Sequence, residues 1–212
     1  MPLPMVHLAI SRQVRELTGS QATPAFLLGS ISPDAIHMRP GSTRQDKRHT
    51  HLLDAPGPAS YQPIRELWHS RRADGRQAAE FAQGYASHLL ADRMWIRSQE
   101  QRFLRSAPRG ASHHDLARLY YGETDWIDLD LYARMPWREQ VWEQLAAARP
   151  VDFRPLLTAE EIGKWRGWTL IWYEGYKLDS LSEPVLITPS IVTAFIDRAA
   201  RTIARYFRDW LR

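Results

Sequence analysis

His88 and Asp92 lie four residues apart in FAQGYASHLLADRMW, residues 81–95. This stretch is rich in Ala, Leu, Met and aromatic residues and contains no proline, so it predicts a helix. At 100° per residue, one narrow stripe of that helix carries Phe81, Gly84, His88, Asp92 and Trp95. Positions i and i+4 are one turn apart, so the imidazole and the carboxylate can reach a single point, as the ligands of a divalent metal must. A His–Asp pair without a metal, buried or on the surface, is the alternative.

Three other residues, all N-terminal to His88, offer further metal-binding groups. His7 lies between Val6 and Leu8 in a predicted apolar helix, Asp34 follows a proline in GSISPDA, and His51 stands in KRHTHLLD. Imidazole nitrogen and carboxylate oxygen are ordinary zinc ligands. Taken singly, each residue also has a plain alternative, namely a core histidine, a turn carboxylate or a solvated histidine. We expect the small residues Gly84 and Ala91 to leave room for an ion beside the helix.

Taken in chain order, these residues resemble the zinc-dependent phospholipase C family, which is related to the S1/P1-type nucleases. The most specific parts are the His-x-x-x-Asp after GY and the SPDA turn, and the resemblance covers roughly residues 1–95. It implies an all-α fold that carries a metal cluster. It also implies that Asp34, His51, His88 and Asp92 form one zinc site, that His7 belongs to a neighbouring site, and that Asp92 bridges the two. We predict Asp34 and Asp92 as the catalytic carboxylates.

The sequence departs from the family's pattern after Asp92. The family has further histidines for another zinc there, but RMWIRSQEQRF contains none. His113 and His114 are followed four residues later by Ala117 and Arg118 instead of an acid. We therefore expect one or two zinc ions and not three, and carboxylate-rich ligation does not exclude Mn²⁺ or Fe²⁺. An acid of GETDWIDLD, such as Asp125 or Asp128, is a further candidate. We predict no ligand role for Pro2, because the family's N-terminal Trp is missing.

A metal site of this kind predicts a hydrolase. Zinc lowers the pKa of a bound water towards about 7, which makes hydroxide available at neutral pH. The resemblance implies a phosphoester substrate, either a small molecule or lipid-like. The basic residues between two ligand segments can offer positive charge to a phosphate or form a solvated loop; they are Arg39, Arg44, Lys47 and Arg48. The alternative is a non-catalytic helical protein with a structural or vestigial metal site, and a third reading is a basic helical binder of nucleic acid.

Composition limits these choices. The chain has 212 residues, of which 44% are hydrophobic, and one domain over residues 1–212 is expected. It contains no cysteine, so disulfides, iron–sulfur clusters and thiolate zinc sites are excluded. The net charge of +4 is spread over many segments, so we expect no stable nucleic-acid complex. The sequence shows neither a signal-peptide pattern nor an apolar run of about 18 residues, and we expect a cytoplasmic protein.

Helical periodicity dominates the elements that must position these residues. We predict helices over residues 4–17, 61–72 and 77–104, one after Thr158, which forms a capping-box pattern with Glu161, and one from Pro189. PAFLLGS is expected to be a short apolar segment before a turn, and residues 39–60 a long loop or broken helix. The predicted fold is an all-α bundle of about seven helices. The tryptophan-rich second half forms either the core or a cover over the site.

Overall fold

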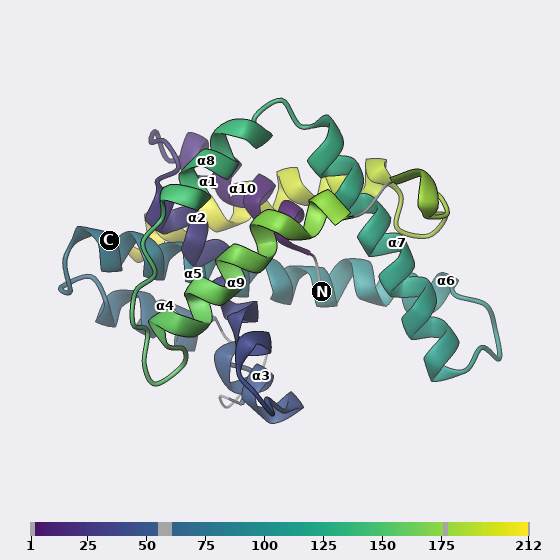
Figure 1. The fold of residues 1–212 in the computed structure, drawn as a ribbon, viewed down its shortest axis with the longest axis horizontal. Helices are drawn as coiled ribbons and strands as arrows, with labels where there is room; N and C mark the ends of the chain where they lie inside the picture. The colour runs from purple at the N-terminus through teal and green to yellow at the C-terminus, as the bar shows by residue number, and fades with distance from the viewer. Residues whose placement is uncertain (1–2, 55–60, 176–177, 212) are drawn as a thin grey trace.

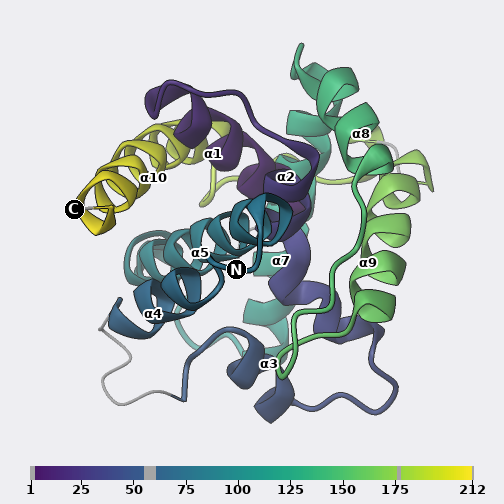
Figure 2. The ribbon, with the colours of Figure 1, turned by 90° about the vertical axis from the view of Figure 1, so that its left-hand side faces the viewer.

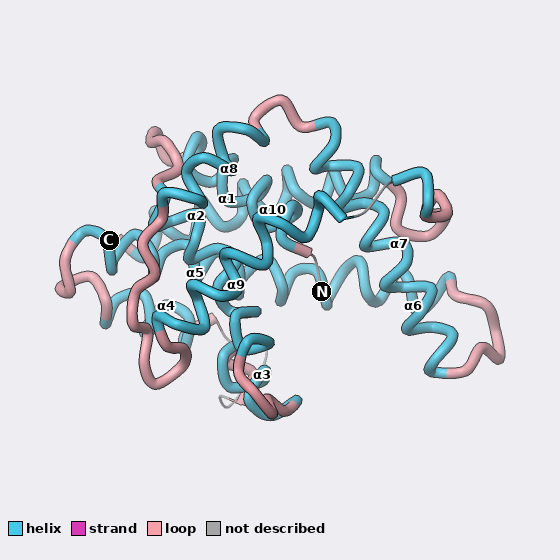
Figure 3. Tube along the Cα trace, viewed as in Figure 1, coloured by secondary structure: helices cyan, strands magenta, loops and turns pink. Residues whose placement is uncertain are grey.

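The computed structural model describes residues 3–54, 61–175 and 178–211. It confirms the all-α prediction, because the described residues form helices and loops and contain no β-strand (Figure 3). The α-helices are α1 (Pro4–Leu17), α2 (Pro24–Ile31), α3 (Arg44–Thr50), α4 (Gln62–Ser70), α5 (Arg76–Trp95), α6 (Gln101–Ser106), α7 (His113–Arg134), α8 (Arg138–Ala147), α9 (Ala159–Trp172) and α10 (Pro189–Trp210). Four shorter turns of helix are η1 (Ser32–Met38), η2 (Ile96–Glu100), η3 (Tyr173–Gly175) and η4 (Leu178–Ser180).

The prediction of about seven helices was too low, because short helices occupy segments that the sequence suggested as loops. PAFLLGS, expected as a short apolar segment before a turn, lies in the short helix α2, whose first turn is capped by the Thr23 side chain. The broken-helix alternative for residues 39–60 is correct over α3, where Thr43 and Asp46 form a capping box. Residues 55–60 lie outside the described part of the chain. The predicted capping box of Thr158 and Glu161 is confirmed at α9.

Helix α5 lies in the middle of the molecule and contacts α1, α2, α4, α10 and η1 (Figure 2). It continues through η2 into α6, so one helical run covers Arg76–Ser106 and confirms the helix predicted over residues 77–104. Phe81, Tyr85 and Leu90 are fully buried along it. The element that carries His88 and Asp92 is therefore enclosed by other helices, which fixes the rotamers of its side chains.

Two glycines allow α2 and α5 to cross closely. A Cβ added to Gly84 would lie 2.0 Å from the carbonyl oxygen of Phe26, and one added to Gly29 would lie 2.1 Å from that of Phe81. No side chain larger than hydrogen fits at either position without moving backbone. The expectation that Gly84 leaves room for an ion was wrong, because the space beside it is filled by the backbone of α2.

The second half of the chain surrounds this centre. In Figure 1, α9 crosses the front of the molecule, and it packs against η1 and α8, while α10 packs against α1. One buried hydrophobic cluster includes residues from Met5 to Trp210. The assignment of residues 1–212 to one domain stays a prediction. No described helix combines the length and the apolar character that crossing a lipid bilayer requires.

Candidate metal centre

The five predicted ligands converge although they come from four different segments. His7 lies on α1, Asp34 on η1, His51 directly after α3, and His88 and Asp92 on α5. The three histidines and Asp92 are at most 3% exposed, and the Asp34 side chain is 13% exposed. Among the described residues, two sets of possible metal ligands result, one of His7, His88 and Asp92 and one of Asp34, His51 and His88. The convergence that the sequence pattern predicted is thus present in the fold.

The separations between these ligand atoms suit a cation better than direct hydrogen bonds. Asp92 Oδ1 lies 3.4 Å from His7 Nε2, and Asp92 Oδ2 lies 3.5 Å from His51 Nε2 and 3.6 Å from His88 Nε2. Asp34 lies 3.5 Å from His51 Nε2 and 3.9 Å from His88 Nε2. Hydrogen bonds are usually about 2.7–3.2 Å long. Ligand atoms about 2.0–2.2 Å from a tetrahedral zinc are roughly 3.3–3.6 Å apart.

The same atoms lack other partners. Within the described ranges 3–54, 61–175 and 178–211, no hydrogen bond satisfies His7 Nε2, His51 Nε2, His88 Nε2 or either carboxylate oxygen of Asp92. A buried polar atom without a partner costs about 1–3 kcal/mol, and more when it is charged. Several such atoms facing one another are consistent with a bound cation, and the donor set of imidazoles and carboxylates fits zinc.

Backbone carbonyls orient two of the histidines. His88 Nδ1 lies 2.8 Å from the carbonyl oxygen of Ser30, and His51 Nδ1 lies 2.9 Å from that of Lys47. Because a carbonyl oxygen can only accept, each Nδ1 carries the proton and donates it. In the neutral rings this leaves the Nε2 lone pair free and directed at the centre, as a metal ligand requires. The Gly29–Gly84 crossing brings Ser30 of α2 to His88 of α5.

Two further contacts position the segments that carry the ligands. Tyr85 on α5 donates from its hydroxyl to the carbonyl oxygen of Thr50, at 2.7 Å, and so fixes the end of α3 beside His51. Asp128 on α7 accepts the backbone N–H groups of Met5 and Val6 in the first turn of α1. Tyr85 itself is fully buried.

Charge in the centre follows from burial and from the close pairing of acids and imidazoles. Burial lowers the pKa of His7 to about 4, helped by the neighbouring His88. For His88, burial acts in the same direction, but the carboxylates of Asp92 and Asp34 outweigh it and raise the pKa. Burial would raise the pKa of both acids, but His88 holds that of Asp92 low, and His51 and Lys47 hold that of Asp34 low. Both carboxylates are therefore anionic at neutral pH, which favours a divalent cation.

Other candidates from the sequence lie elsewhere. His49, His113 and His114 are exposed. Asp125 and Asp128 belong to neither of the ligand sets found among the described residues. Pro2 lies outside the described ranges. The expectation that the additional histidine-rich zinc site of the family is missing here stays a prediction.

Of the four basic residues proposed for phosphate, one faces the centre. Arg39 binds Glu161 through two nitrogens, at 2.6 and 3.2 Å, Arg48 binds Asp54 at 2.9 Å, and Arg44 is exposed. Lys47 Nζ instead lies 2.9 Å from Asp34 Oδ1. The sequence held a signal for this position, because Lys47 precedes His51 by one helical turn and so shares its face of α3.

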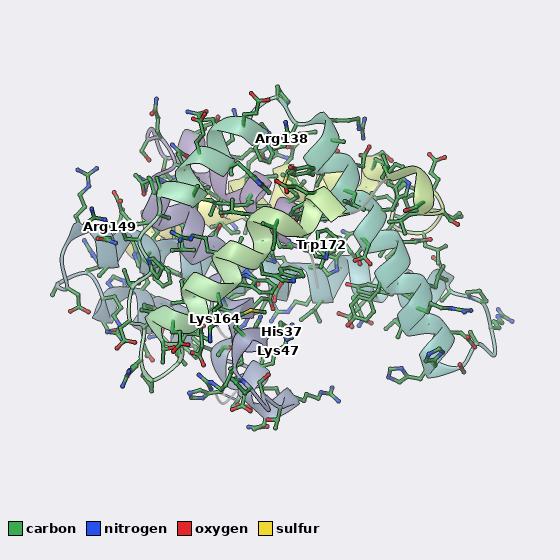
Figure 4. The ribbon with its side chains drawn as sticks, viewed as in Figure 1. His37, Lys47, Arg138, Arg149, Lys164 and Trp172 are labelled. Carbon is green, nitrogen blue, oxygen red and sulfur yellow. The ribbon has the colours of Figure 1, made fainter. Side chains whose placement is uncertain are left out.

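The Lys47 side chain lines a cavity of about 300 Å³ beside the metal centre. Its wall includes Asp34, His37, Lys47, Trp165, Trp168 and Trp172. Figure 4 shows His37 and Lys47 below Trp172, which projects from α9. The question of whether the aromatic second half forms core or cover is thus answered in part, because these tryptophans line an opening next to the ligands. The sequence gave no indication that α9 and η1 would meet.

Comparison with known families agrees with this geometry. Residues 6–95 match the family model described as zinc dependent phospholipase C. Over this segment, which is less than half of the 212 residues, the chain is similar to that family. The match spans α1 to the end of α5 and so contains all five converging residues. Searches of curated proteins and of solved structures found no match to the chain. The relationship to S1/P1-type nucleases stays a prediction.

Proposed function

We propose that this chain is a metal-dependent hydrolase of lipid-like phosphoesters, with His7, Asp34, His51, His88 and Asp92 as its metal ligands. The observation that carries the proposal is the set of buried imidazole nitrogens and Asp92 oxygens that face one another without hydrogen bonds in the described part of the chain. The phosphoester comes from the family description. When bound, zinc would supply a water of lowered pKa and polarise the phosphoryl group.

The two acids have different roles in this proposal. Asp92 directs Oδ1 to His7 and Oδ2 to His51 and His88, so it is suited to join two ion positions. Asp34 contacts both the histidines and Lys47, so it joins the centre to the adjoining cavity. One or two zinc ions remain our expectation. A location in the cytoplasm, the absence of a stable nucleic-acid complex and a single domain also stay predictions.

A second candidate function is a structural metal site without turnover. It is favoured by the exposure of His113 and His114 and by their absence from the ligand sets of the described residues. A centre with fewer ions has fewer positive charges with which to clamp a phosphate. The two functions share the metal site and differ in whether a phosphoester is hydrolysed.

Elemental analysis of protein purified without added metal tests the site. We expect one or two ions per chain, lost after chelation, and little metal in Asp34→Asn. The matched control is Asp54→Asn, because Asp54 is exposed and lies three residues after His51. A metal-free protein, or an Asp34→Asn variant with normal metal content, would overturn the assignment.

Hydrolysis of a chromogenic phosphodiester and a monoester, with and without Zn²⁺ or Mn²⁺, then separates the two functions. We expect turnover that chelation abolishes and metal restores. Persistent inactivity of fully loaded protein towards these compounds and towards a short-chain phospholipid would favour the structural role.

A further inference from the structure

The cavity of about 300 Å³ beside the metal centre combines one cationic side chain with a wall of aromatic rings. Asp34 connects the two regions, because its Oδ1 lies 3.5 Å from His51 Nε2 and 2.9 Å from Lys47 Nζ. A group held at Lys47 would therefore lie next to the metal ligands.

Lys47 is arranged to bind an anion in this cavity. An ammonium group has three N–H donors. Two of its directions are used by Asp34, at 2.9 Å, and by His37 Nε2, at 3.1 Å. The Lys47 side chain is 29% exposed, and it is the only lysine or arginine among the described residues that line the cavity. One donor direction thus remains for an oxygen that enters the cavity.

The tryptophans that line the cavity give it an apolar surface. Trp165 and Trp168 stack with ring centroids 4.8 Å apart and an interplanar angle of 13°. Trp172 continues the row, with its ring centroid 5.7 Å from that of Trp168. Trp165 is 7% exposed, whereas Trp168 is 37% exposed, so the outer ring is open to contact. Indole faces bind alkyl groups by apolar contact and dispersion.

We propose that this cavity binds a phosphate group at Lys47 and the apolar substituent of the same molecule against Trp168 and Trp172. The ligand class is a monomeric phosphoester with an alkyl or acyl chain. The assignment rests on the proposed function, since it places the phosphate beside the metal ligands. It goes further by stating which residues select the two parts of the substrate.

Binding of hexyl phosphate and of inorganic phosphate to the zinc-loaded protein tests the two parts separately. Both are titrated by calorimetry and by tryptophan emission. We expect hexyl phosphate to bind more tightly than phosphate and to change the emission. Phosphate binding alone, equal for both compounds, would overturn the apolar half of the proposal.

Variants assign the two contacts. Lys47→Met should lower the affinity for both compounds by about 10-fold or more, because a charge-assisted hydrogen bond is lost. Lys47→Arg should restore part of that affinity. Trp168→Ala should lower the affinity for hexyl phosphate by about 10-fold and leave the affinity for inorganic phosphate unchanged. The controls are Lys164→Met, an exposed lysine paired with Glu160 on α9, and Trp137→Ala, which lies outside the cavity.

Metal content is measured for every variant, so the two proposals can fail separately. Normal metal content with unchanged hexyl phosphate affinity in Lys47→Met would overturn the phosphate contact and leave the metal centre intact. Unchanged affinity in Trp168→Ala would overturn the aromatic contact. A wild-type protein without metal that still binds hexyl phosphate through Lys47 and Trp168 would support the cavity and reject the hydrolase.

Discussion

Asp92 and Asp128 are both carboxylates on long helices and are nearly inaccessible, with exposed fractions of 3% and 0%. Their partners differ. Asp92 faces three imidazoles at 3.4–3.6 Å and makes no hydrogen bond to any described residue. Asp128 accepts the backbone N–H groups of Met5 and Val6, at 3.2 and 3.3 Å, and the hydroxyl of Tyr173.

Burial acts on both carboxyls in the same direction, but the result is opposite. Burial raises the pKa of Asp128 to about 7, although Tyr173 and the two N–H groups act against it. At Asp92 the same effect is outweighed by His88 and His7, and the pKa is lowered. A buried acid satisfied by N–H donors is a helix cap, whereas a buried acid facing lone pairs suits a cation. The predictions below test this distinction.

The largest expected effect is that of Asp92→Asn on metal binding. The variant keeps the size of the side chain but removes the negative charge that faces His7, His51 and His88. Zinc affinity should fall by about 100-fold or more, beyond the cost of losing an outer-shell partner. Competition with a chromogenic chelator measures the change. Asp128→Asn is the matched control, and equal affinities in the two variants would remove the distinction between the acids.

Asp128→Ala should mainly lower stability. It removes the acceptor of three hydrogen bonds, two from the start of α1 and one from Tyr173, and we expect a loss of about 3 kcal/mol in the free energy of unfolding. Urea denaturation of the metal-free proteins measures it. Metal content should stay close to that of the wild type, since Asp34, His51 and His88 are untouched. A variant as stable as the wild type would show that the cap contributes nothing.

The pH dependence gives a smaller, graded effect. The pKa of His88 is raised in the metal-free fold. Its charged form therefore stabilises the folded protein below about pH 6.5, and this contribution to stability is lost as the pH rises through the raised pKa. Zinc competes with that proton. The rise in melting temperature on adding zinc should therefore increase from about pH 6 to pH 8.

Melting curves with zinc and with chelator, at several pH values, measure this difference. Asp128 titrates in both samples, and its contribution cancels when one is subtracted from the other. A zinc effect that is independent of pH over this interval would show that binding displaces no proton from the centre.

The smallest expected effect is that of His113→Ala. His113 is exposed at the first turn of α7 and belongs to neither ligand set of the described residues. Metal content should not change within error. Loss of an ion in this variant would show that a further metal position exists near α7.

Sequence reasoning singled out five residues that converge in the fold, although it misread some of the structure around them. His88 and Asp92 follow from helical spacing alone, because residues four apart on a helix share a face. His7, Asp34 and His51 followed from the order of motifs in the family resemblance, and the fold brings them to the same point. Gly84 was misread because a glycine on a helix face signals close approach without showing what approaches. Here the neighbour is the backbone of α2.

The sequence by itself determined the helical class, the spacing of the α5 pair, the caps of α9 and the types of ligand available. These depend on local periodicity and on side-chain chemistry, which act over a few residues. Only the tertiary structure decided that Ser30 orients His88, that Lys47 contacts Asp34 and that the α9 tryptophans line the adjoining cavity. These contacts join different helical segments, some of them more than about a hundred residues apart in the chain. Their register depends on how whole helices pack.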